Sequence, residues 1–355
     1  MKGIKSKLPQ PFLNFLAENG VDCSVYELAK ENPRYIRLRA GENVSLDDLE
    51  KAFNATVIQV PWLLSFYELP SNVKIASSQL YKEGKIYGID LSSGAAVYAL
   101  NVQIGHHCLD LCCAPGAKLC MLSDAVGKLG SVTGVDIHAQ RLSSCRGVLN
   151  KYKHYNVRLY NCDGANFSIP APNQPPRFSF PHAFPEKAQP LTIFYLPSAW
   201  GPTGLSSGFY DRVLVDAECT HDASIKHVIK YEKWGWDSFE RRLFTPERLA
   251  SLCALQKRLL QRGFDLLKTG GFLVYSTCSF SVCQNEEVVK DLLVNNRDAF
   301  LVKIEVPNLP VELLNQGNTN DEEIRTKTIR FDPVTSRTSG LFIAKVKKLP
   351  SQVKP

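Results

Sequence analysis

The stretch Asp110-Leu111-Cys112-Cys113-Ala114-Pro115-Gly116-Ala117-Lys118 ends a predicted strand in a turn of small residues and then opens a helix. The apolar face of that helix consists of Leu119, Leu122 and Val126. Small residues in such a turn let backbone amides and the N-terminus of the helix come close to a ligand. The stretch therefore predicts a strand, a ligand-binding turn and a helix, which is the repeating unit of an α/β fold.

Strands alternate with helices from about residue 76 onward. The predicted strands are 109–111, 131–135, 157–161, 213–215 and 272–275. This order predicts a mostly parallel sheet covered on both faces. A helix before the last strand starts at Thr245 and Pro246 and is predicted to end at Gly270 and Gly271. Its apolar stripe, a core feature, is Leu249, Leu252, Leu255, Leu259 and Leu260.

The first 75 residues have a different sequence pattern from the rest of the chain. They mix short helical patterns with Tyr35-Ile36-Arg37-Leu38-Arg39, whose alternation places both arginines on one face. That face either contacts phosphate or belongs to a solvated basic edge strand. We expect a small N-terminal α/β domain at 1–75 and a larger domain at 76–350.

Residues 169–208 interrupt the larger domain with nine prolines. Proline lacks the backbone N–H that a sheet needs, so this segment is predicted to be a surface insertion. Its aromatic side chains either stack on a partner or hold the loop to the body, and we favour the second interpretation. They are Phe178, Phe180, Phe184, Phe194, Tyr195 and Trp200.

The composition is that of a globular protein. The chain has 355 residues, of which 44% are hydrophobic and 22% charged, which excludes disordered and fibrous classes. No apolar run reaches the roughly 18 residues of a membrane helix, and residues 1–15 lack the apolar core of a secretory signal. We therefore expect an intracellular, monomeric protein with no membrane partner. The net charge of +7 is compatible with a polyanionic partner.

Eleven cysteines are scattered along the chain without the spacing of a small disulfide scaffold. This favours reduced thiols. One histidine- and cysteine-rich stretch has no second ligand pair at zinc-like spacing, so we expect no metal site there. Its residues are His106, His107, Cys108, Cys112 and Cys113.

A carboxylate follows the second predicted strand. Asp136 comes twenty residues after Gly116, where it can accept the hydroxyls of a ribose. A single glycine fits a phosphate-binding dinucleotide fingerprint poorly and fits adenosine with an amino-acid tail better. Asp163, after the third strand, is placed to accept from an adenine amino group. The alternatives are a helix N-cap for Asp136 and an Asp-Gly turn for Asp163.

Three more side chains follow the fourth and fifth strands: Asp216, Cys219 and Cys278. Ligands of open α/β sheets bind beyond the carboxyl ends of the strands, so these groups are predicted to share a pocket. A single cysteine after a strand is usually a small apolar filler. Two of them beside an aspartate favour covalent chemistry on a bound base.

Taken in order, these motifs resemble those of the Sun/Nop-type RNA cytosine-5 methyltransferases. The resemblance rests on Asp110 to Lys118, Asp136, Asp163, Asp216-Ala217-Glu218-Cys219 and Tyr275-Ser276-Thr277-Cys278-Ser279, and it extends to a closing hairpin near Arg330-Phe331-Asp332. It implies a Rossmann-like class I methyltransferase fold. It also implies S-adenosyl-L-methionine as the cofactor and a single-stranded or flipped cytosine of tRNA or rRNA as the substrate.

The resemblance implies a role for each site residue. Cys278 is the nucleophile that adds to ring carbon 6 of cytosine, Asp216 activates the base at ring nitrogen 3, and Cys219 helps release the product. Lys118 either supports the cofactor carboxylate and a nearby thiolate or is an idle surface lysine. The implied cofactor-binding residues are Cys112, Cys113, Ala114, Pro115, Gly116, Ala117, Lys118, Asp136, Asp163 and Asp216.

Basic and aromatic residues after Cys219 suggest a path for RNA. We predict RNA contacts for Arg37, Arg39, Lys226 and Lys230, and stacking on Trp234 and Trp236. Further basic residues there are His227, Lys233, Arg241 and Arg242. The alternative is a solvated face with buried tryptophans.

The chain departs from the family pattern around the second thiol. Glu218 stands where the family usually has proline, Thr220-His221-Asp222 replaces a Ser-Gly-type continuation, and Ala117 replaces a glycine. A carboxylate beside Cys219 disfavours its thiolate. Two alternatives remain open: a cofactor-binding RNA scaffold with little turnover, and a DNA cytosine methyltransferase in which Cys219 attacks.

Overall fold

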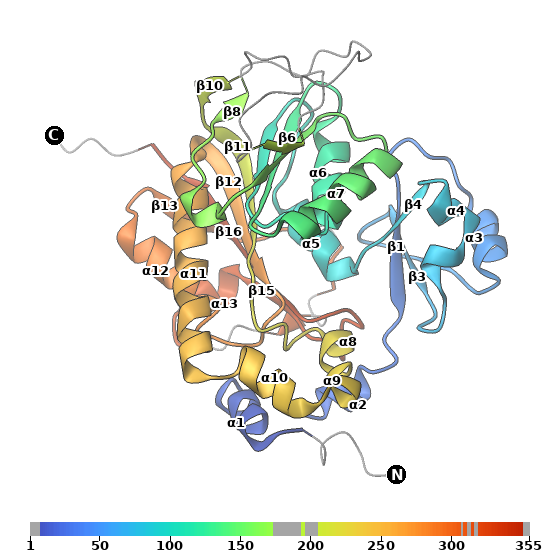
Figure 1. Ribbon diagram of the computed structural model, residues 1–355, viewed down its shortest axis with the longest axis horizontal. Helices are drawn as coiled ribbons and strands as arrows, with labels where there is room; N and C mark the ends of the chain where they lie inside the picture. The colour runs from blue at the N-terminus through green and yellow to red at the C-terminus, as the bar shows by residue number, and fades with distance from the viewer. Residues whose placement is uncertain are drawn as a thin grey trace.

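The computed structural model describes residues 8–172, 193–195, 205–306, 308–310, 314–315 and 319–350 (Figure 1). Five strands lie parallel at the centre of a ten-stranded sheet, in the order β7-β6-β5-β11-β12. They are β5 (His107–Asp110), β6 (Ser131–Asp136), β7 (Val157–Asn161), β11 (Tyr210–Asp216) and β12 (Leu267–Thr277). The predicted parallel core is therefore confirmed. The order reverses direction between β5 and β11, which is where such sheets bind ligands.

Antiparallel strands extend both edges of this core. β16 (Leu341–Lys348) pairs with β12, and both β13 (Ala299–Val302) and β15 (Ile329–Phe331) pair with β16. β14 (Leu314–Asn315) follows β15. On the opposite edge, β9 (Ile193–Tyr195) pairs antiparallel with β7.

Helices cover both faces of the sheet (Figure 1). One face carries α5 (Leu91–Ala99), α6 (Ala117–Val126) and α7 (Ala139–Lys151). The other carries α11 (Pro246–Asp265), α12 (Glu286–Asn295), α13 (Glu322–Lys327) and the short turn η3 (Gly164–Asn166). Each face has its own apolar core, and the predicted helix residues Leu119, Leu122 and Val126 are buried in the first. No helix among the described residues has the length and apolarity to cross a membrane.

Helix α11 starts as predicted and ends earlier than predicted. Thr245 caps it by accepting from the Arg248 N–H, but the helix stops at Asp265. Gly270 and Gly271 lie inside β12 instead, where the pairing with β11 shifts register. A Cβ on Gly271 would meet the Asp211 carbonyl oxygen at 2.8 Å. Gly271 thus allows a close approach of two strands, while Gly270 adopts a left-handed φ of 81°, and neither terminates the helix.

The N-terminal region forms a second, antiparallel sheet in the order β2-β3-β1-β4. Its elements are β1 (Arg34–Leu38), β2 (Ile58–Gln59), β3 (Phe66–Leu69), β4 (Ile86–Gly88), α3 (Leu46–Phe53), η2 (Ile75–Ser77) and α4 (Gln79–Lys82). The sheet thus continues to Gly88, past the residue-75 boundary expected from the sequence.

The first two helices pack against the segment that follows Cys219. α1 (Gln10–Glu18) and α2 (Val25–Leu28) share an apolar cluster with α8 (Ile225–Val228), α9 (Tyr231–Trp234) and α10 (Trp236–Leu243), the segment after Cys219. The hydroxyl of Tyr26 donates to the Asp222 carbonyl oxygen at 2.7 Å. The N-terminal segment therefore supports the turn that carries Cys219.

Arg37 is not a surface residue. β1 is a central strand, and the Arg37 guanidinium is 5% exposed, stacks on Tyr87 and pairs with Asp124 of α6 at 2.5 Å. The predicted RNA contact of Arg37 is therefore wrong, because the side chain joins the N-terminal sheet to α6. Arg39 lies just beyond β1, partly exposed and 3.8 Å from Glu42.

Within the proline-rich segment, β8 (Ala171–Pro172) pairs with β10 (Leu205–Gly208). Phe194 and Tyr195 belong to β9. Phe178, Phe180, Phe184 and Trp200 lie outside the described residues.

Candidate active site

A pocket opens beyond the carboxyl ends of the parallel strands, at the reversal point between β5 and β11. It is lined by Leu111, Cys112, Ala114, Asp136, Ile137, His138, Arg141, Asp163, Gly164, Asp216, Ala217, Glu218, His221, Leu255, Leu259 and Cys278. Residues from five separate motifs of the sequence thus meet in one place, as predicted from the common edge of the strands.

The turn after β5 shapes one wall of this pocket. Gly116 begins α6 with φ at 107°, a left-handed conformation that favours glycine, and a Cβ there would meet the Cys145 sulfur at 2.8 Å. The Cys113 N–H donates to the Val135 carbonyl oxygen at 2.9 Å, which fixes the turn against β6. Cys113 is therefore a buried packing residue of the turn and does not line the pocket.

Asp136 and Asp163 both line the pocket, and each is held mainly by its own turn. Asp136 accepts from the His138 N–H at 2.9 Å and from the Ala114 N–H at 3.3 Å. The N-cap of α7 is His138, so Asp136 does not have the capping role. Asp163 caps η3 by accepting from the Ala165 N–H at 2.9 Å. Asp163 therefore stabilises its own turn and also lines the pocket.

Lys118 reaches the end of β11 from the first turn of α6. Its Nζ lies 2.8 Å from Asp216 Oδ2 and 2.9 Å from Ser93 Oγ, and Ser276 Oγ donates to Asp216 Oδ1 at 2.7 Å. Burial acts to lower the pKa of Lys118, but the Asp216 carboxylate reverses this and the net shift is upward. Lys118 is therefore a charged partner of Asp216 and not an idle surface lysine.

Asp110 lies behind these two groups at the end of β5. It is buried, and desolvation together with the nearby Asp216 raises its pKa to about 8. Its Oδ1 accepts from the Cys112 N–H at 3.3 Å. Asp110 thus stabilises the turn that follows β5.

The two predicted thiols meet. β11 and β12 pair in parallel with Asp216 opposite Ser276, so the turns after both strands leave the sheet at the same level. The sulfur atoms of Cys219 and Cys278 lie 3.5 Å apart. Cys278 is partly exposed to the pocket, whereas Cys219 is 1% exposed behind it.

His221 completes a thiol cluster, a name used here for Cys219, His221 and Cys278. Its Nδ1 lies 2.9 Å from the Cys278 sulfur and 3.6 Å from the Cys219 sulfur. The two sulfur atoms and the His221 nitrogen lie within 4.8 Å of one another, close enough for all three to bind one metal ion. The 2.9 Å contact between His221 Nδ1 and the Cys278 sulfur is a hydrogen bond, so the cluster is described below as two thiols and an imidazole.

Electrostatics couple the members of the thiol cluster. The thiolate of Cys278 raises the pKa of His221 to about 9, against the effect of burial. The hydrogen bond with Cys219 and burial raise the pKa of Cys278, while the imidazole of His221 opposes that rise. A protonated His221 therefore favours the thiolate of Cys278.

A buried polar clamp, formed by Asp222, Thr220 and Ser279, ties the two thiol turns together. Asp222 Oδ1 accepts from the hydroxyls of Thr220 and, at 2.8 Å, of Ser279. Its Oδ2 accepts from the Phe280 N–H at 2.7 Å. One carboxylate thus bonds the residue after each thiol.

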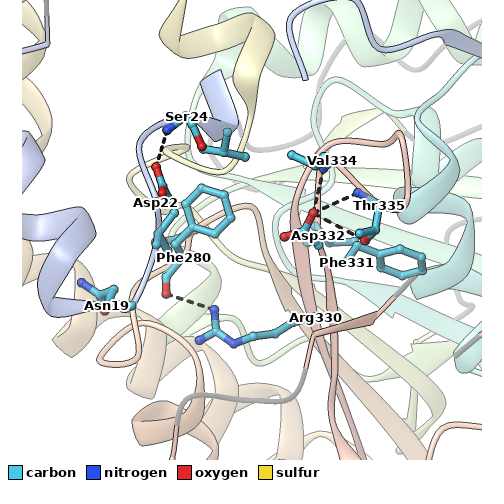
Figure 2. A pocket seen from close by; sticks show the side chains of 14 residues that line it. Asn19, Asp22, Ser24, Phe280, Arg330, Phe331, Asp332, Val334 and Thr335 are labelled. Carbon is cyan, nitrogen blue, oxygen red and sulfur yellow. Dashed lines mark hydrogen bonds between the residues drawn. The ribbon is translucent and has the colours of Figure 1, made fainter. Parts of the chain in front are cut away.

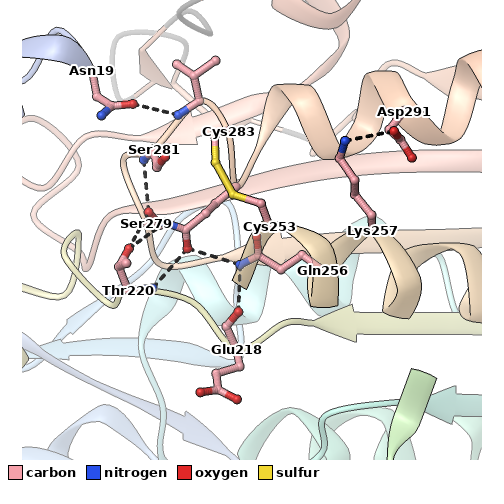
Figure 3. The surroundings of a disulfide bond; sticks show 12 residues. Asn19, Glu218, Thr220, Cys253, Gln256, Lys257, Ser279, Ser281, Cys283 and Asp291 are labelled. Carbon is pink, nitrogen blue, oxygen red and sulfur yellow. Dashed lines mark hydrogen bonds and ion pairs between the residues drawn. A yellow bond between two sulfur atoms is a disulfide. The ribbon is translucent and has the colours of Figure 1, made fainter. Parts of the chain in front are cut away.

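Two glutamines and a disulfide reinforce the turn of Cys219 (Figure 3). Gln256 Nε2 donates to the Glu218 carbonyl oxygen at 2.7 Å, and Gln284 Oε1 accepts from the Thr220 N–H at 3.1 Å. The expectation of reduced thiols throughout is wrong here, because Cys253 and Cys283 form a disulfide that joins α11 to the turn before α12. The other nine cysteines are free. The bonded pair is 30 residues apart, so no local spacing revealed it.

Comparison with known proteins assigns the chain to a family. The family model described as 16S rRNA methyltransferase RsmB/F matches residues 97–173 and 199–347. The chain belongs to the RsmB/F family. Its fold is that of solved relatives such as the methyltransferase homolog protein from Pyrococcus horikoshii, at 26% identity and a TM-score of 0.65, covering 96% of this chain and all of that one. The NSun6 protein from Pyrococcus horikoshii, solved with SFG, gives a TM-score of 0.69 at 15% identity, covering 97% of this chain and 99% of that one.

Curated relatives of this RsmB/F protein modify RNA. The human 28S rRNA (cytosine(4447)-C(5))-methyltransferase is 30% identical over 80% of this chain but only 30% of its own length. The tRNA (cytosine(49)-C(5))-methyltransferase of Pyrococcus abyssi is 26% identical over 81% of this chain and 79% of its own length. The chain thus spans less than a third of the first relative and most of the second.

The RsmB/F site contains residues that sequence reasoning passed over or misjudged. Four buried polar residues belong to this set: Asp222, Gln256, Gln284 and Asn285. The sequence signal that could have indicated them is the polar run Gln284-Asn285-Glu286 at the start of an amphipathic helix. The carboxylate of Glu218, which also lines the pocket, pairs with Arg248 of α11 at 2.5 Å, so a cation that the sequence did not reveal partly neutralises the charge next to Cys219.

The predicted RNA-contact residues after Cys219 lie on short helices of the RsmB/F protein. Lys226 and Lys230 are exposed; Lys226 Nζ donates to the Pro33 carbonyl oxygen at 3.2 Å, and Lys230 Nζ lies 5.9 Å from the Trp234 ring centre. Trp234 is 58% exposed, whereas Trp236 packs into the apolar cluster below. Lys230 and Trp234 therefore form an exposed pair of a cation and an aromatic ring.

A second pocket lies beside the Cys278 turn (Figure 2). It is enclosed by 19–25 of the N-terminal segment, by Ser279 and Phe280, and by the hairpin at 330–335. Arg330 donates to the Phe280 carbonyl oxygen at 3.0 Å and pairs with Glu286 at 2.5 Å. This pocket adjoins the thiol cluster but contains none of its sulfur atoms.

Proposed function

We propose that this chain is an S-adenosyl-L-methionine-dependent RNA methyltransferase that forms 5-methylcytosine through a covalent adduct of Cys278. The observation that carries the proposal is the meeting of two thiols 3.5 Å apart, at the pocket that also holds Asp136, Asp163 and Asp216. Membership of the RsmB/F family supports the same reaction.

The chemistry explains why two thiols are needed. Ring carbon 5 of cytosine is a weak nucleophile until a thiolate adds to ring carbon 6. Cys278 faces the pocket and is the proposed nucleophile. Cys219 is buried behind Cys278, in contact with its sulfur atom, and is the proposed base that removes the proton from carbon 5. Asp216, held by Lys118 and Ser276, is the proposed partner of ring nitrogen 3.

The pocket suits a nucleoside with an amino-acid tail. Asp136 and Asp163 offer carboxylate oxygens at one end, and Ile137, Leu255 and Leu259 provide apolar surface. S-adenosyl-L-methionine, when bound, supplies the methyl group. We assign Cys112, Ala114, Asp136, Asp163 and Asp216 to its binding, with Pro115, Gly116, Ala117 and Lys118 shaping the turn.

The names of the relatives point to rRNA or tRNA as the substrate class. A target base must leave its stack to reach a thiol in a pocket. Lys230 and Trp234 together offer a positive charge and a stacking surface for the neighbouring nucleotides. We therefore propose that RNA approaches over α8 and α9.

The test uses purified protein, radiolabelled S-adenosyl-L-methionine and total cellular RNA. Cys278→Ala is expected to abolish label transfer, and Cys219→Ala is expected to accumulate a protein–RNA adduct that survives denaturing electrophoresis. Unchanged methylation by both variants would refute the two-thiol mechanism. Tight cofactor binding without label transfer to any RNA would select the scaffold alternative, and adducts on DNA oligonucleotides alone would select the DNA enzyme.

A further inference from the structure

We propose that His221 is a catalytic acid–base residue that serves both thiols in turn, holding the proton of Cys278 during attack and supporting Cys219 during release. The proposal rests on the proposed function for the identity of the reaction, while the thiol–imidazole pair can be tested without RNA.

The geometry places one ring nitrogen between two sulfur atoms. His221 Nδ1 is 2.9 Å from the Cys278 sulfur and 3.6 Å from the Cys219 sulfur. No other described side chain is recorded within hydrogen-bond distance of both thiols. A single imidazole is therefore in range of the proposed nucleophile and of the proposed release group.

The backbone of His221 is held in an uncommon conformation to achieve this. Its φ is 55°, in the left-handed region that costs a non-glycine residue about 1 kcal/mol or more. The turn is fixed by the Ala223 N–H, which donates to the Cys278 carbonyl oxygen at 3.1 Å, and by Asp222 in the polar clamp. Strain retained at such a position is typical of functional sites.

The charges around the ring favour its protonated form. The groups that face it are Cys219, Cys278, Asp216, Asp222 and His227, with Lys118 next to Asp216. Cys278 raises the pKa of His221 to about 9, and Asp216 and Asp222 add to that rise. The His221–Cys278 pair therefore shares one proton, and its transfer from sulfur to Nδ1 places an imidazolium beside the Cys278 thiolate.

The proton balance of the cycle is complete with these residues. His221 Nδ1 takes the S–H proton of Cys278, and the electron pair left on sulfur forms the bond to ring carbon 6. Carbon 5 then takes the methyl group, which the sulfonium cofactor, when bound, would supply while leaving as a neutral thioether, and Cys278, now also a thioether, no longer needs a counter-ion. The imidazolium gives its proton to solvent through the pocket, and the neutral Nδ1 then takes the S–H proton of Cys219. Cys219 removes the proton from carbon 5 as the sulfur–carbon bond breaks, which returns Cys278 as a thiolate opposite the same imidazolium.

The first experiment measures alkylation of Cys278 by iodoacetamide as a function of pH, by mass spectrometry of the Cys278 peptide. The variant is His221→Asn, since asparagine tolerates a left-handed backbone. Loss of the imidazolium is expected to slow alkylation at pH 7 by at least tenfold and to move the midpoint of the profile to higher pH. The matched control is His227→Asn, whose ring contacts His221 with centres 5.3 Å apart but contacts neither sulfur, and it is expected to leave the profile unchanged. An identical profile in His221→Asn and the wild type would overturn the proposal.

The second experiment addresses release. At a pH high enough to ionise Cys278 without help, His221→Asn is expected to recover attack and to accumulate the RNA adduct, which is also the result expected of Cys219→Ala. Recovery of full turnover with no adduct would refute the role in release. If the wild type methylates no RNA while the alkylation profiles still differ, the proposed function fails and the thiol–imidazole pair stands.

Discussion

The two sides of the pocket are built in different ways. On the cofactor side, Asp136 and Asp163 accept hydrogen bonds from backbone groups two residues further along the chain. On the thiol side, Asp222 and Gln284 bond residues 57 to 64 positions away. The cofactor side is thus held mainly by local turns, with one longer-range bond from the Ala114 N–H to Asp136, whereas the thiol side is assembled mainly from distant segments that meet only in the folded sheet.

This difference predicts how each side responds to substitution. A local turn keeps its conformation when one bond is lost, because its neighbours in sequence remain in place. A long-range clamp holds two independent turns, so its loss frees both of them and leaves several buried donors unpaired. Substitutions on the thiol side should therefore cost more stability than matched substitutions on the cofactor side.

The largest expected effect comes from the disulfide. Cys253→Ser removes a cross-link that closes a loop of about 30 residues, and the free energy of unfolding is expected to fall by about 3–4 kcal/mol. The matched control is Cys162→Ser, a free cysteine at the end of the cofactor side, with an expected change below about 1 kcal/mol. Urea unfolding measures both. A thiol titration of the denatured, unreduced protein should count nine thiols, and a count of eleven would contradict the bond.

The polar clamp should show the next largest effect. Asp222→Ala removes the acceptor of the Thr220 and Ser279 hydroxyls and of the Phe280 N–H, and is expected to cost about 3 kcal/mol. Asp163→Ala removes the cap of η3 and is expected to cost about 1 kcal/mol. If urea unfolding shows that both variants lose the same free energy of unfolding, the proposed difference between the two sides of the pocket is wrong.

A pH effect is expected from Asp110, which lies between the two sides. Its folded-state pKa of about 8 lies above the ordinary value of 3.8, so the folded state binds this proton more tightly than the unfolded state. The contribution is present at low pH and is lost as pH rises from about 4 through 8. Asp110→Asn should remove this slope, so its stability relative to the wild type should rise as the pH increases from 4 to 9. Parallel stability curves for the two proteins between pH 5 and pH 9 would contradict this assignment.

The smallest expected effect is that of Glu218, the neighbour of Cys219. Its pair with Arg248 is more than a third exposed on both sides, so Glu218→Gln should change stability by less than about 1 kcal/mol. RNA methylation should also be nearly unchanged, because the carboxylate faces α11. A large change in methylation would instead show that the carboxylate acts on Cys219.

The sequence pattern predicted the parallel strands, the start of α11, the pocket residues Asp136, Asp163, Asp216 and Cys278, and the placement of Cys219 beside them. These features depend on periodicity or on a few consecutive residues, which a single sequence displays. The sequence pattern mispredicted Arg37 and Gly271, because their roles depend on what packs against them, and it mispredicted Gly270, whose left-handed φ of 81° lies within β12. Arg37 has Asp124 as its partner 87 residues away, and Gly271 avoids a backbone carbonyl of the neighbouring strand.

By itself, therefore, the sequence determined the cofactor turn, the order of the strands and the presence of two thiols at strand ends. Only the tertiary structure brought those thiols to 3.5 Å, placed His221 against both and bonded Cys253 to Cys283. The physical reason is the separation of the interacting residues along the chain. A turn is encoded by residues that are already neighbours, whereas the thiol cluster requires β11 and β12 to pair with Asp216 opposite Ser276. That register is fixed by the packing of the whole sheet.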